Sequence, residues 1–310
     1  MSAPALDRPV ADPAAFSAAT AAALLAAGLD AAAVAAVIDR ALAEDFADGP
    51  DVTTTATVPA GTRGRASITP RVPGVLAGAP VALAALDAVL GDTLVVESVA
   101  ADGSVLRPGV PALVVSGPVP ALLSAERTAL NLIGHLSGIA TATRTWVDAV
   151  AGTGTRIRDT RKTLPGLRAL EKYAVRCGGG VNHRMSLGDA ALIKDNHVEA
   201  AGSVTAAVAA VRALRPDITL EVEVDTPDQL TEALAVGAEL ILLDNFSVAD
   251  TAAAVRLVRS GHPGVRLESS GGLTLDVAAD YARTGVDFLA VGGLTHSAAV
   301  LDLGMDLQKF

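Results

Sequence analysis

The sequence predicts an α/β protein built in two parts, with a change of pattern near residue 124. Before this point, short β-rich runs alternate with Gly/Pro turns, which is typical of an α+β unit on an antiparallel sheet. After it, short apolar runs are each followed by polar residues and a helical pattern, the signature of parallel βα units. A full eight-stranded barrel needs about 250 residues, so we predict a reduced barrel of six or seven strands.

Composition limits the class of function. The net charge of −10 over 310 residues argues against a surface for nucleic acid or anionic membranes. The single cysteine, Cys177, excludes an intramolecular disulfide and a cysteine-based metal site. The alanine-rich stretch 14–27 is broken by Gly28 and Asp30 and is typical of an amphipathic helix, not of a membrane span or a signal peptide. We therefore expect a cytoplasmic protein.

The first part combines helical and β-rich segments. Apolar positions recur at helical spacing over 14–43, and from residue 51 the pattern changes to short β-rich runs. The expected strands are 65–70, 93–99 and 111–115, and 81–89 is expected to be helical. A long helix, or a broken pair, is expected over 124–149.

In the second part, the residues that follow each strand are the informative ones. The six expected strands are 156–159, 191–193, 218–224, 240–243, 265–267 and 287–291. Charged or glycine-rich residues follow every one of them. In a parallel barrel these ends meet at one mouth, where the active site lies. Polar loops also simply solvate strand ends, but the regularity of this pattern favours a functional site.

Basic residues are concentrated around the first strand of this part. They are Arg158, Arg161, Lys162, Arg168, Lys172, Arg176, His183 and Arg184. Such a concentration in an acidic chain predicts a polyanionic ligand, because arginine binds carboxylates bidentately and lysine holds phosphate oxygens. We expect Arg158, Arg168, Lys172 and Arg176 to be helix-surface residues. The remaining four lie beside turn sequences and are the candidates for anion binding.

Glycine-rich loops follow the last two strands. Glu268-Ser269-Ser270-Gly271-Gly272 comes first, and Gly292-Gly293 follows the next strand. The last strands of such barrels commonly bind phosphate through backbone amides, so we assign a sugar 5′-phosphate to these loops. The glycines 178–180 are a second, weaker candidate for a phosphate nest.

Glu223 and Asp244 stand at the ends of neighbouring strands and offer hard oxygen ligands. In the absence of a histidine or cysteine cluster, Mg²⁺ bridged by substrate phosphate is the natural metal. Glu221 shares the strand face of Glu223 by two-residue alternation and can act with it. The alternative for these carboxylates is a structural salt bridge to Lys194 or to an arginine.

Ten short segments of the chain, taken in order, resemble the quinolinate phosphoribosyltransferase family. The similarity covers about residues 40 to 305 in the family's order. The matching segments are 126–128, 136–141, 159–163, 165–168, 171–175, 178–184, 192–197, 221–225, 243–246 and 294–297.

The resemblance implies a two-domain subunit that makes nicotinate mononucleotide from quinolinate and phosphoribosyl pyrophosphate for NAD biosynthesis. It implies an amino-terminal α/β sandwich, which we place at 1–125, and an incomplete six- or seven-stranded α/β barrel, which we place at 126–296. The tail 297–310 is expected to pack back on the first domain. The resemblance also implies a head-to-tail homodimer in which Arg127 enters the neighbouring active site.

Carried over by position, the family's roles fall on the residues already singled out. Quinolinate would be surrounded by Arg127, Arg161, His183 and Arg184. Lys162 and Lys194 would lie between it and the pyrophosphate, and Glu223 and Asp244 would hold the ribose hydroxyls and Mg²⁺. The 5′-phosphate would be held by Ser270, Gly271, Gly272, Gly292 and Gly293. The substrate-binding set is completed by Thr160, Leu294 and His296, and the catalytic set is Lys162, Lys194, Glu223 and Asp244.

The chain departs from the family's pattern at a few places. Leu164 stands where a second threonine is usual, and Met185-Ser186 follow the His-Arg pair. Ala290 and Gly293 stand where serine and alanine are common. The last two changes bear on how the final loop contacts phosphate.

Three other functions remain open from the sequence. A phosphoribosyltransferase for another acid, such as nicotinate or the ligand of a molybdenum-associated paralogue, should need fewer arginines. A barrel aldolase could form a Schiff base on Lys194, but would have no use for two phosphate loops and a magnesium pair. A non-catalytic sugar-phosphate binding module would not need both lysines and both carboxylates.

Overall fold

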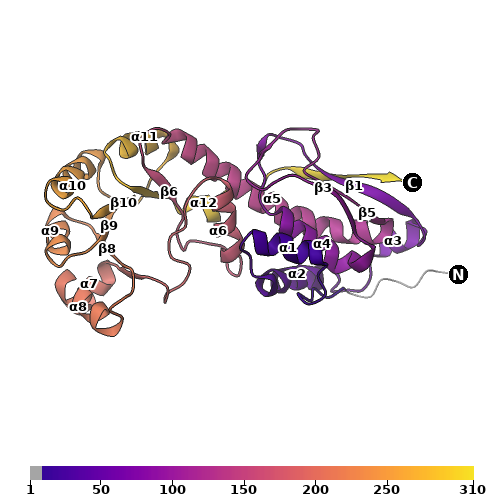
Figure 1. Cartoon of the computed structure of the whole chain (residues 1–310), viewed down its shortest axis with the longest axis horizontal. Coiled ribbons are helices and arrows are strands. Elements are labelled where there is room, and N and C mark those ends of the chain that lie inside the picture. Colours follow the sequence, from indigo (N-terminus) through magenta and orange to yellow (C-terminus); the bar gives the residue numbers. More distant parts are fainter. Residues whose placement is uncertain (1–8) are drawn as a thin grey trace. The chain divides into compact units, whose positions relative to one another are not determined.

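The computed structural model describes residues 9–310 and divides into two compact units (Figure 1). The first unit contains the residues up to Ala142 together with Leu164–Gly179 and Ser297–Phe310. The second unit contains Thr143–Thr163 and Gly180–His296.

The division falls inside the long helix α5 (Val119–Ala149), later than residue 126, where the sequence analysis places it. Hydrogen bonds tie α5 to the first unit as far along the helix as Thr141. The backbone N–H of Ala77 donates to Ser137 Oγ (3.1 Å), and that of Val75 donates to Thr141 Oγ1 (2.8 Å). The change of pattern near residue 124 therefore falls inside α5.

The first unit pairs an antiparallel sheet with helices. Strands β1 (Arg63–Pro70), β3 (Val95–Val99), β5 (Leu113–Pro118) and β12 (Leu303–Lys309) form a sheet in the order β12-β1-β5-β3. Two short strands, β2 (Gly74–Val75) and β4 (Val105–Leu106), pair separately. The helices are α1 (Ala18–Ala26), α2 (Ala31–Asp45), α3 (Val52–Thr57), α4 (Ala79–Leu90), the 3₁₀ turn η1 (Gly91–Thr93) and α6 (Arg168–Cys177). Helix α4 packs on β5, and α1 and α2 pack on α4.

The carboxyl-terminal tail completes this sheet. Strand β12 runs antiparallel to β1 along its whole length, from Gly64 opposite Lys309 to Pro70 opposite Leu303. On its other side β1 pairs with β5. Residues far apart in the sequence thus form adjacent strands of the first unit.

Local capping explains where the amino-terminal helices begin and end. The helical pattern over 14–43 is divided into α1 and α2 at Gly28, which adopts a φ of +66° that favours glycine. Asp30 caps α2 by accepting from the N–H of Ala32. Asp51 likewise accepts from the N–H of Thr54 (2.9 Å) and begins α3 in a Val/Thr segment, before the first expected strand at 65–70. An N-cap outweighs the β propensity of this segment.

The second unit is a six-stranded parallel sheet with helices following its strands (Figure 1). Its strands are β6 (Arg156–Arg158), β7 (Ala191–Ile193), β8 (Leu220–Val224), β9 (Leu240–Asp244), β10 (Arg266–Ser270) and β11 (Phe288–Ala290). Its helices are α7 (Asp195–Ala201), α8 (Val204–Leu214), α9 (Pro227–Ala235), α10 (Val248–Gly261), α11 (Leu275–Arg283) and the short α12 (Gly293–His296).

The sheet does not close into a full barrel. Its order is β6-β11-β10-β9-β8-β7, so the consecutive strands β6 and β7 are its two edges. The only long helix between them in sequence, α6, belongs to the first unit. The predicted incomplete barrel of six or seven strands is therefore confirmed, with six.

Strand register places the predicted site residues on one face of this sheet. Asp244 lies opposite Ser270, and Glu223 lies opposite Leu242, two residues before Asp244. Because side chains alternate along a strand, Glu223, Asp244 and Ser270 share a face at the carboxyl ends of three neighbouring strands. Branched apolar runs in β8 and β9 fix this register, since Val222, Val224, Ile241 and Leu243 are buried on the opposite face.

Within residues 9–310, no single helix has the length and apolar composition of a membrane span, although the bent pair α1–α2 meets that test when its two helices are taken together.

Candidate active site

Asp159, at the end of β6, holds two basic segments together. Its carboxylate is fully buried and accepts from the backbone N–H of His183 (2.8 Å) and from Asn182 Nδ2 (2.5 Å). The 180–184 segment also forms a parallel bridge to β6 between Arg158 and Val181. The loop that carries Arg161 and Lys162 and the segment that carries His183 and Arg184 are thereby fixed to one strand end.

Arg161 and Arg184 place two positive charges close to each other. Burial, and next the charge of Arg161, lower the pKa of Arg184. The guanidinium of Arg184 donates to the backbone carbonyl of Ala190 through Nη1 (3.0 Å). Two guanidinium groups held near each other form a site suited to a ligand with two carboxylates.

Lys162 lies against the glycine loop that follows β11. A Cβ at Gly292 would be 2.8 Å from Lys162 Cδ and 3.5 Å from both Thr160 Oγ1 and His296 Nε2. Thr295 Oγ1 donates to the backbone carbonyl of Lys162 (2.7 Å). The structure therefore brings Thr160, Lys162, Gly292 and His296 together at the ends of β6 and β11.

This contact leads to a prediction about Gly292→Ala. The added methyl group would displace the lysine stem, and a misplacement of about 1 Å at a reacting centre can cost on the order of 10²-fold in rate. We expect a large loss of turnover with little change in melting temperature, because the stem that must move is exposed.

Gly293→Ala is the matched control. No described atom lies within 4 Å of the place where its Cβ would be, so this variant should lose far less activity than Gly292→Ala. Equal losses in the two variants would contradict the role given to the Lys162 contact. Steady-state rates and thermal melts of both variants make the comparison.

The ends of β7, β8 and β9 carry one lysine and several carboxylates. Lys194 Nζ forms an ion pair with Glu223 Oε2, and this lysine remains about half exposed. Burial, followed by the charges of Asp244 and Asp195, raises the pKa of Asp225. Negative charge is therefore crowded at this edge, which suits a cation or a developing positive charge.

The loops after β9 and β10 interlock. The backbone N–H of Asn245 donates to the carbonyl of Ser270 (2.9 Å), and Asn245 adopts a left-handed conformation with a φ of 55°. Gly271 (φ +93°) and Gly272 (φ +59°) follow directly. A Cβ at Gly271 would overlap the Asn245 side chain and approach its backbone nitrogen at 2.8 Å. Only glycine fits there, so the loop backbone is held close to Asn245 beside Asp244.

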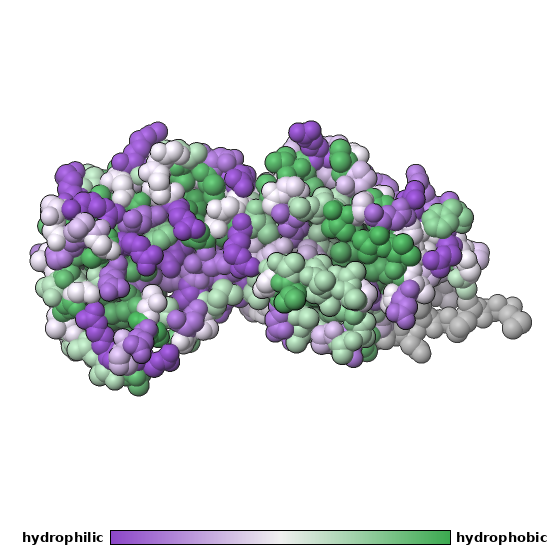
Figure 2. Space-filling view, viewed as in Figure 1, coloured by the Kyte–Doolittle hydropathy of each residue, from purple (hydrophilic) through white to green (hydrophobic). Residues whose placement is uncertain are grey.

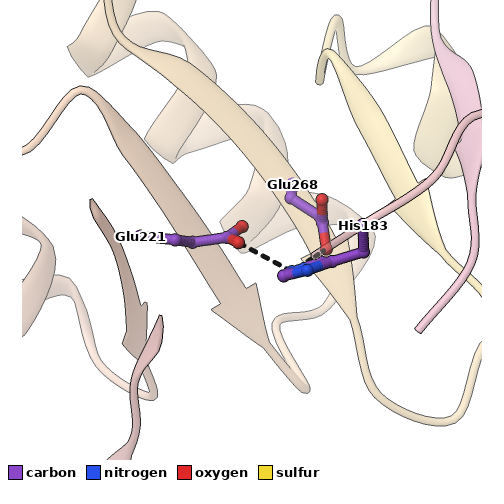
Figure 3. Close-up of side chains that lie close together, drawn as sticks. All are labelled: His183, Glu221 and Glu268. Carbon is purple, nitrogen blue, oxygen red and sulfur yellow. Dashed lines mark ion pairs between the residues drawn. The ribbon is translucent and has the colours of Figure 1, made fainter. Parts of the chain in front are cut away.

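A second group of charged side chains lies buried within the same sheet. We call Arg158, His183, Glu221 and Glu268 the buried cluster. Arg158 Nη1 lies 2.6 Å from Glu268 Oε2 and 3.7 Å from Glu221 Oε1. His183 Nε2 lies 2.7 Å from Glu221 Oε2 and 3.9 Å from Glu268 Oε1 (Figure 3).

Burial dominates the electrostatics of this cluster. It raises the pKa of Glu221 and of Glu268 to about 7 each, and Arg158 opposes the increase in both. For Glu268 the second cause of the increase is the negative charge of Glu221. The pair of carboxyl groups therefore holds a proton more tightly than exposed glutamates do.

Comparisons with known proteins agree with this geometry. The model of the quinolinate phosphoribosyl transferase amino-terminal domain matches residues 51–137, and that of the carboxyl-terminal domain matches residues 139–306. The chain is 60% identical over 271 residues to a nicotinate-nucleotide pyrophosphorylase [carboxylating] of Mycobacterium leprae, covering 87% of this chain and 95% of that protein.

The chain belongs to the quinolinate phosphoribosyltransferase family.

Solved structures of this family share the fold. A nicotinate-nucleotide pyrophosphorylase from Francisella tularensis superposes with a TM-score of 0.84 at 37% identity, covering 89% of this chain and 96% of that one. A structure from Streptococcus pyogenes gives a TM-score of 0.85 at 37% identity, covering 91% and 99%. Both superpositions extend over nearly the whole length of the solved proteins.

Of the substrate and catalytic residues that the quinolinate phosphoribosyltransferase resemblance implies, all but one belong to the second unit. Hydrophilic side chains gather in the middle of that unit, over strands β6 and β8 to β10 (Figure 2). Leu294 is buried, so its side chain is part of the packing and its backbone is what a ligand could reach. The residues in this unit are Thr160, Arg161, Lys162, His183, Arg184, Lys194, Glu223, Asp244, Ser270, Gly271, Gly272, Gly292, Gly293, Leu294 and His296.

Arg127 is the exception, because it belongs to the first unit. It is an exposed residue on α5 and lines a pocket of about 400 Å³. Most of the charged residues in that lining are acidic, and they include Glu44, Asp45, Asp48 and Asp51. Asp45 accepts from Thr128 Oγ1 (3.0 Å) and Asp51 from Ser124 Oγ (3.1 Å), so acids flank this face of α5.

Two expectations about the basic residues are corrected. Lys172 is fully buried on α6, and Arg158 is engaged in the buried cluster, so neither is a helix-surface residue. Residues 170–175 of α6 are all buried, and six consecutive residues go round the whole helix, so this part of α6, with Lys172, is covered on every side. The surface expectation treated these side chains as solvated.

The phosphate nest proposed for glycines 178–180 is also wrong for its first two members. The N–H of Gly178 donates to Ala174 (3.0 Å), and that of Gly179 donates to Arg176 (2.9 Å). These bonds end α6, and Gly179 takes the left-handed conformation (φ +94°) that such endings require. Backbone groups already paired within a helix end have no free donor for an anion.

The sequence did not identify three residues that fix the site residues in place. It indicated Asp159 and Glu268 only as members of the polar segments that follow strands, and it indicated Arg158 as a surface residue. An acidic residue that directly precedes a basic loop at a strand end is a usable signal for Asp159. For Glu268 the sequence of β10, Arg266-Leu267-Glu268-Ser269-Ser270, holds no comparable signal.

Proposed function

We propose that this chain transfers the phosphoribosyl group of phosphoribosyl pyrophosphate to quinolinate and decarboxylates the adduct. The products are nicotinate mononucleotide, pyrophosphate and CO₂, a step of NAD biosynthesis. Family membership supports the reaction. The observation that carries the choice of acid is the proximity of Arg161 and Arg184 at the end of β6, beside Lys162.

The carboxylates and lysines fit the first chemical step. Departure of pyrophosphate leaves positive charge at ribose C1, and Glu223 and Asp244 stand where carboxylates can stabilise it. Lys162 and Lys194 supply ammonium groups for the negative charge of the leaving group. The ring nitrogen of quinolinate then forms the bond to C1 as the bond to pyrophosphate breaks.

The second step needs no side-chain nucleophile. The quaternary ring nitrogen accepts the electron pair of the bond between C2 and its carboxylate, so CO₂ leaves and C2 takes a proton. Arg161 and Arg184 bind the dicarboxylate and orient it. Only binding that is stronger in the transition state speeds the reaction, so the arginines must not hold the departing carboxylate too firmly.

We propose Mg²⁺ as the metal, held by Glu223 and Asp244. The donor set supports this, since both residues present hard oxygen ligands from neighbouring strand ends on one face of the sheet. Burial, followed by the negative charges of Asp244 and Asp195, raises the pKa of Asp225, and these charges give a cation a favourable environment. When bound, Mg²⁺ would neutralise charge on the phosphates of phosphoribosyl pyrophosphate.

We propose that the enzyme is a cytoplasmic homodimer in which Arg127 of one subunit completes the active site of the other. The family resemblance supports the shared site. Arg127 is exposed on α5 in the first unit, whereas the other fifteen predicted site residues belong to the second unit. A shared site would make the dimer necessary for activity.

The decisive assay measures CO₂ and pyrophosphate released from quinolinate, phosphoribosyl pyrophosphate and Mg²⁺. We expect the two products in equal amounts, and no release when a chelator removes the metal. Nicotinate is the comparison substrate, because it has only one carboxylate, whereas Arg161 and Arg184 can bind two. Pyrophosphate release with nicotinate and none with quinolinate would overturn the proposed function.

A further inference from the structure

The buried cluster includes His183, which directly precedes Arg184. Glu268 is fully buried, and Glu221 and His183 are buried as well. Figure 3 shows the ring of His183 between the two carboxyl groups, which come from strands β8 and β10. Burying charged groups to this degree destabilises the fold unless each group has a partner. We therefore ask what this arrangement does.

The hydrogen bonds of His183 determine its tautomer. The backbone N–H of Arg184 donates to His183 Nδ1 (2.7 Å), so Nδ1 carries no proton. The proton of the neutral ring is then on Nε2, which lies 2.7 Å from Glu221 Oε2. The ring therefore accepts at Nδ1 from the peptide of Arg184, and its Nε2 lies at ion-pair distance from Glu221.

A metal ion does not fit the cluster. One ligand atom each from His183, Glu221 and Glu268 lie within 4.8 Å of one another, which is the spacing of a cation site. However, a protonated Nε2 cannot coordinate a metal. The positive charge that the carboxylates require is already supplied by Arg158, at 2.6 Å from Glu268. The cluster is a network of ion pairs and hydrogen bonds.

We propose that Glu221 and Glu268, bridged by Arg158, are positioning residues that fix His183 and, through its ring, the backbone of Arg184 at the quinolinate carboxylates. The chain of contacts is continuous. Arg158 joins Glu268 to Glu221, Glu221 holds the His183 ring, and the ring accepts from Arg184. Asp159 fixes the same segment from the other end by accepting from the His183 backbone (2.8 Å). This inference rests on the proposed function, because it assigns quinolinate to Arg184.

The test compares two substitutions of similar size at Glu221. Glu221→Gln keeps a polar oxygen beside His183 Nε2, whereas Glu221→Leu removes it and leaves the Arg158–Glu268 pair intact. We expect Glu221→Leu to raise the KM for quinolinate on the order of tenfold, as loss of an outer partner of a binding residue typically does. The KM for phosphoribosyl pyrophosphate should not change, and Glu221→Gln should restore the quinolinate KM to near the wild-type value.

A second readout does not depend on turnover. The chain has five histidines, and ring ¹⁵N NMR can distinguish the tautomer of each, with the His183 signals assigned by their loss in His183→Gln. The wild-type and Glu221→Gln enzymes should show His183 with the proton on Nε2. Glu221→Leu should show a mixture of tautomers.

Asp287→Asn provides the control for a lost ion pair in the same unit. Asp287 pairs with Arg259 (2.8 Å) and accepts from the N–H of Leu267, at the amino-terminal ends of β10 and β11. This variant should melt at a lower temperature, with an unchanged quinolinate KM and an unchanged His183 tautomer.

The outcomes separate the two hypotheses. A wild-type His183 protonated on Nδ1, or a Glu221→Leu enzyme with unchanged tautomer and unchanged quinolinate KM, would overturn the positioning role. Absence of quinolinate turnover in the wild type, with the Nε2 tautomer present and lost in Glu221→Leu, would overturn the proposed function and leave the structural part of the inference supported.

Discussion

Replacing Lys162 by alanine should reduce turnover by about 10²–10³-fold, the usual effect of losing one preorganised contact to developing charge. The lysine stem lies against Gly292, between Thr160 and His296, and its ammonium group is exposed at the ends of the strands. The backbone carbonyl of Lys162 still accepts from Thr295 in the variant. The melting temperature should therefore stay close to that of the wild type.

Two further variants make this result specific. Lys162→Arg keeps the charge but replaces a compact ammonium by a planar guanidinium, so it should recover only part of the activity. Arg283→Ala removes one positive charge from the surface of the same unit, where Arg283 pairs only with Asp280 among the contacts described (2.7 Å), and should have full activity. A Lys162→Ala enzyme within a few-fold of wild-type turnover would mean that this lysine is a surface group.

The second unit could be predicted closely because its local patterns agree with its fold. The six strands lie at or next to their expected positions, and they are parallel as the strand-loop-helix repeat indicates. The convergence of strand ends then follows from topology alone. This topology supports the expectation that Lys162, Lys194, Glu223 and Asp244 lie at one edge of the sheet, whereas their catalytic roles follow from the family resemblance.

Other features depend on partners that lie far away in the sequence. Lys172 resembles a solvated lysine of an amphipathic helix, and only the packing of α6 in the first unit shows that it is buried. Arg158 and Glu268 are 110 residues apart, and their ion pair requires β6 and β10 to lie in one sheet. Burial and pairing of charges are decided by tertiary structure, which residue periodicity does not contain.

Local capping also explains helix α3, for which no element was predicted. The Val/Thr segment of α3 has β propensity, but the carboxylate of Asp51 satisfies the N–H of Thr54 and begins a helix. Propensity is a weak preference that such a cap can reverse.

Mixing two inactive variants should restore activity if each active site is shared between subunits. Arg127→Ala and Lys194→Ala should each be nearly inactive, since each removes a cation that the proposed reaction requires. Arg127 belongs to the first unit and Lys194 to the second. In a mixed dimer, one active site combines the intact Lys194 of one subunit with the intact Arg127 of the other. The second active site contains both substitutions.

The size of the recovery is set by counting. With random exchange, half of the dimers are mixed and each has one good site of two, so activity should approach about a quarter of the wild type. Activity is measured after subunit exchange has been demonstrated with an independent label on each variant.

Lys162→Ala mixed with Lys194→Ala is the matched control. Both residues belong to the second unit of the same chain, so every site in a mixed dimer lacks one of them and no activity should return. Recovery in this control would mean that exchange has restored something other than a shared site. Conversely, no recovery from Arg127→Ala with Lys194→Ala, despite proven exchange, would place Arg127 in the active site of its own subunit. The physical reason for a dimer would then be lost, because a complete site would need only one chain.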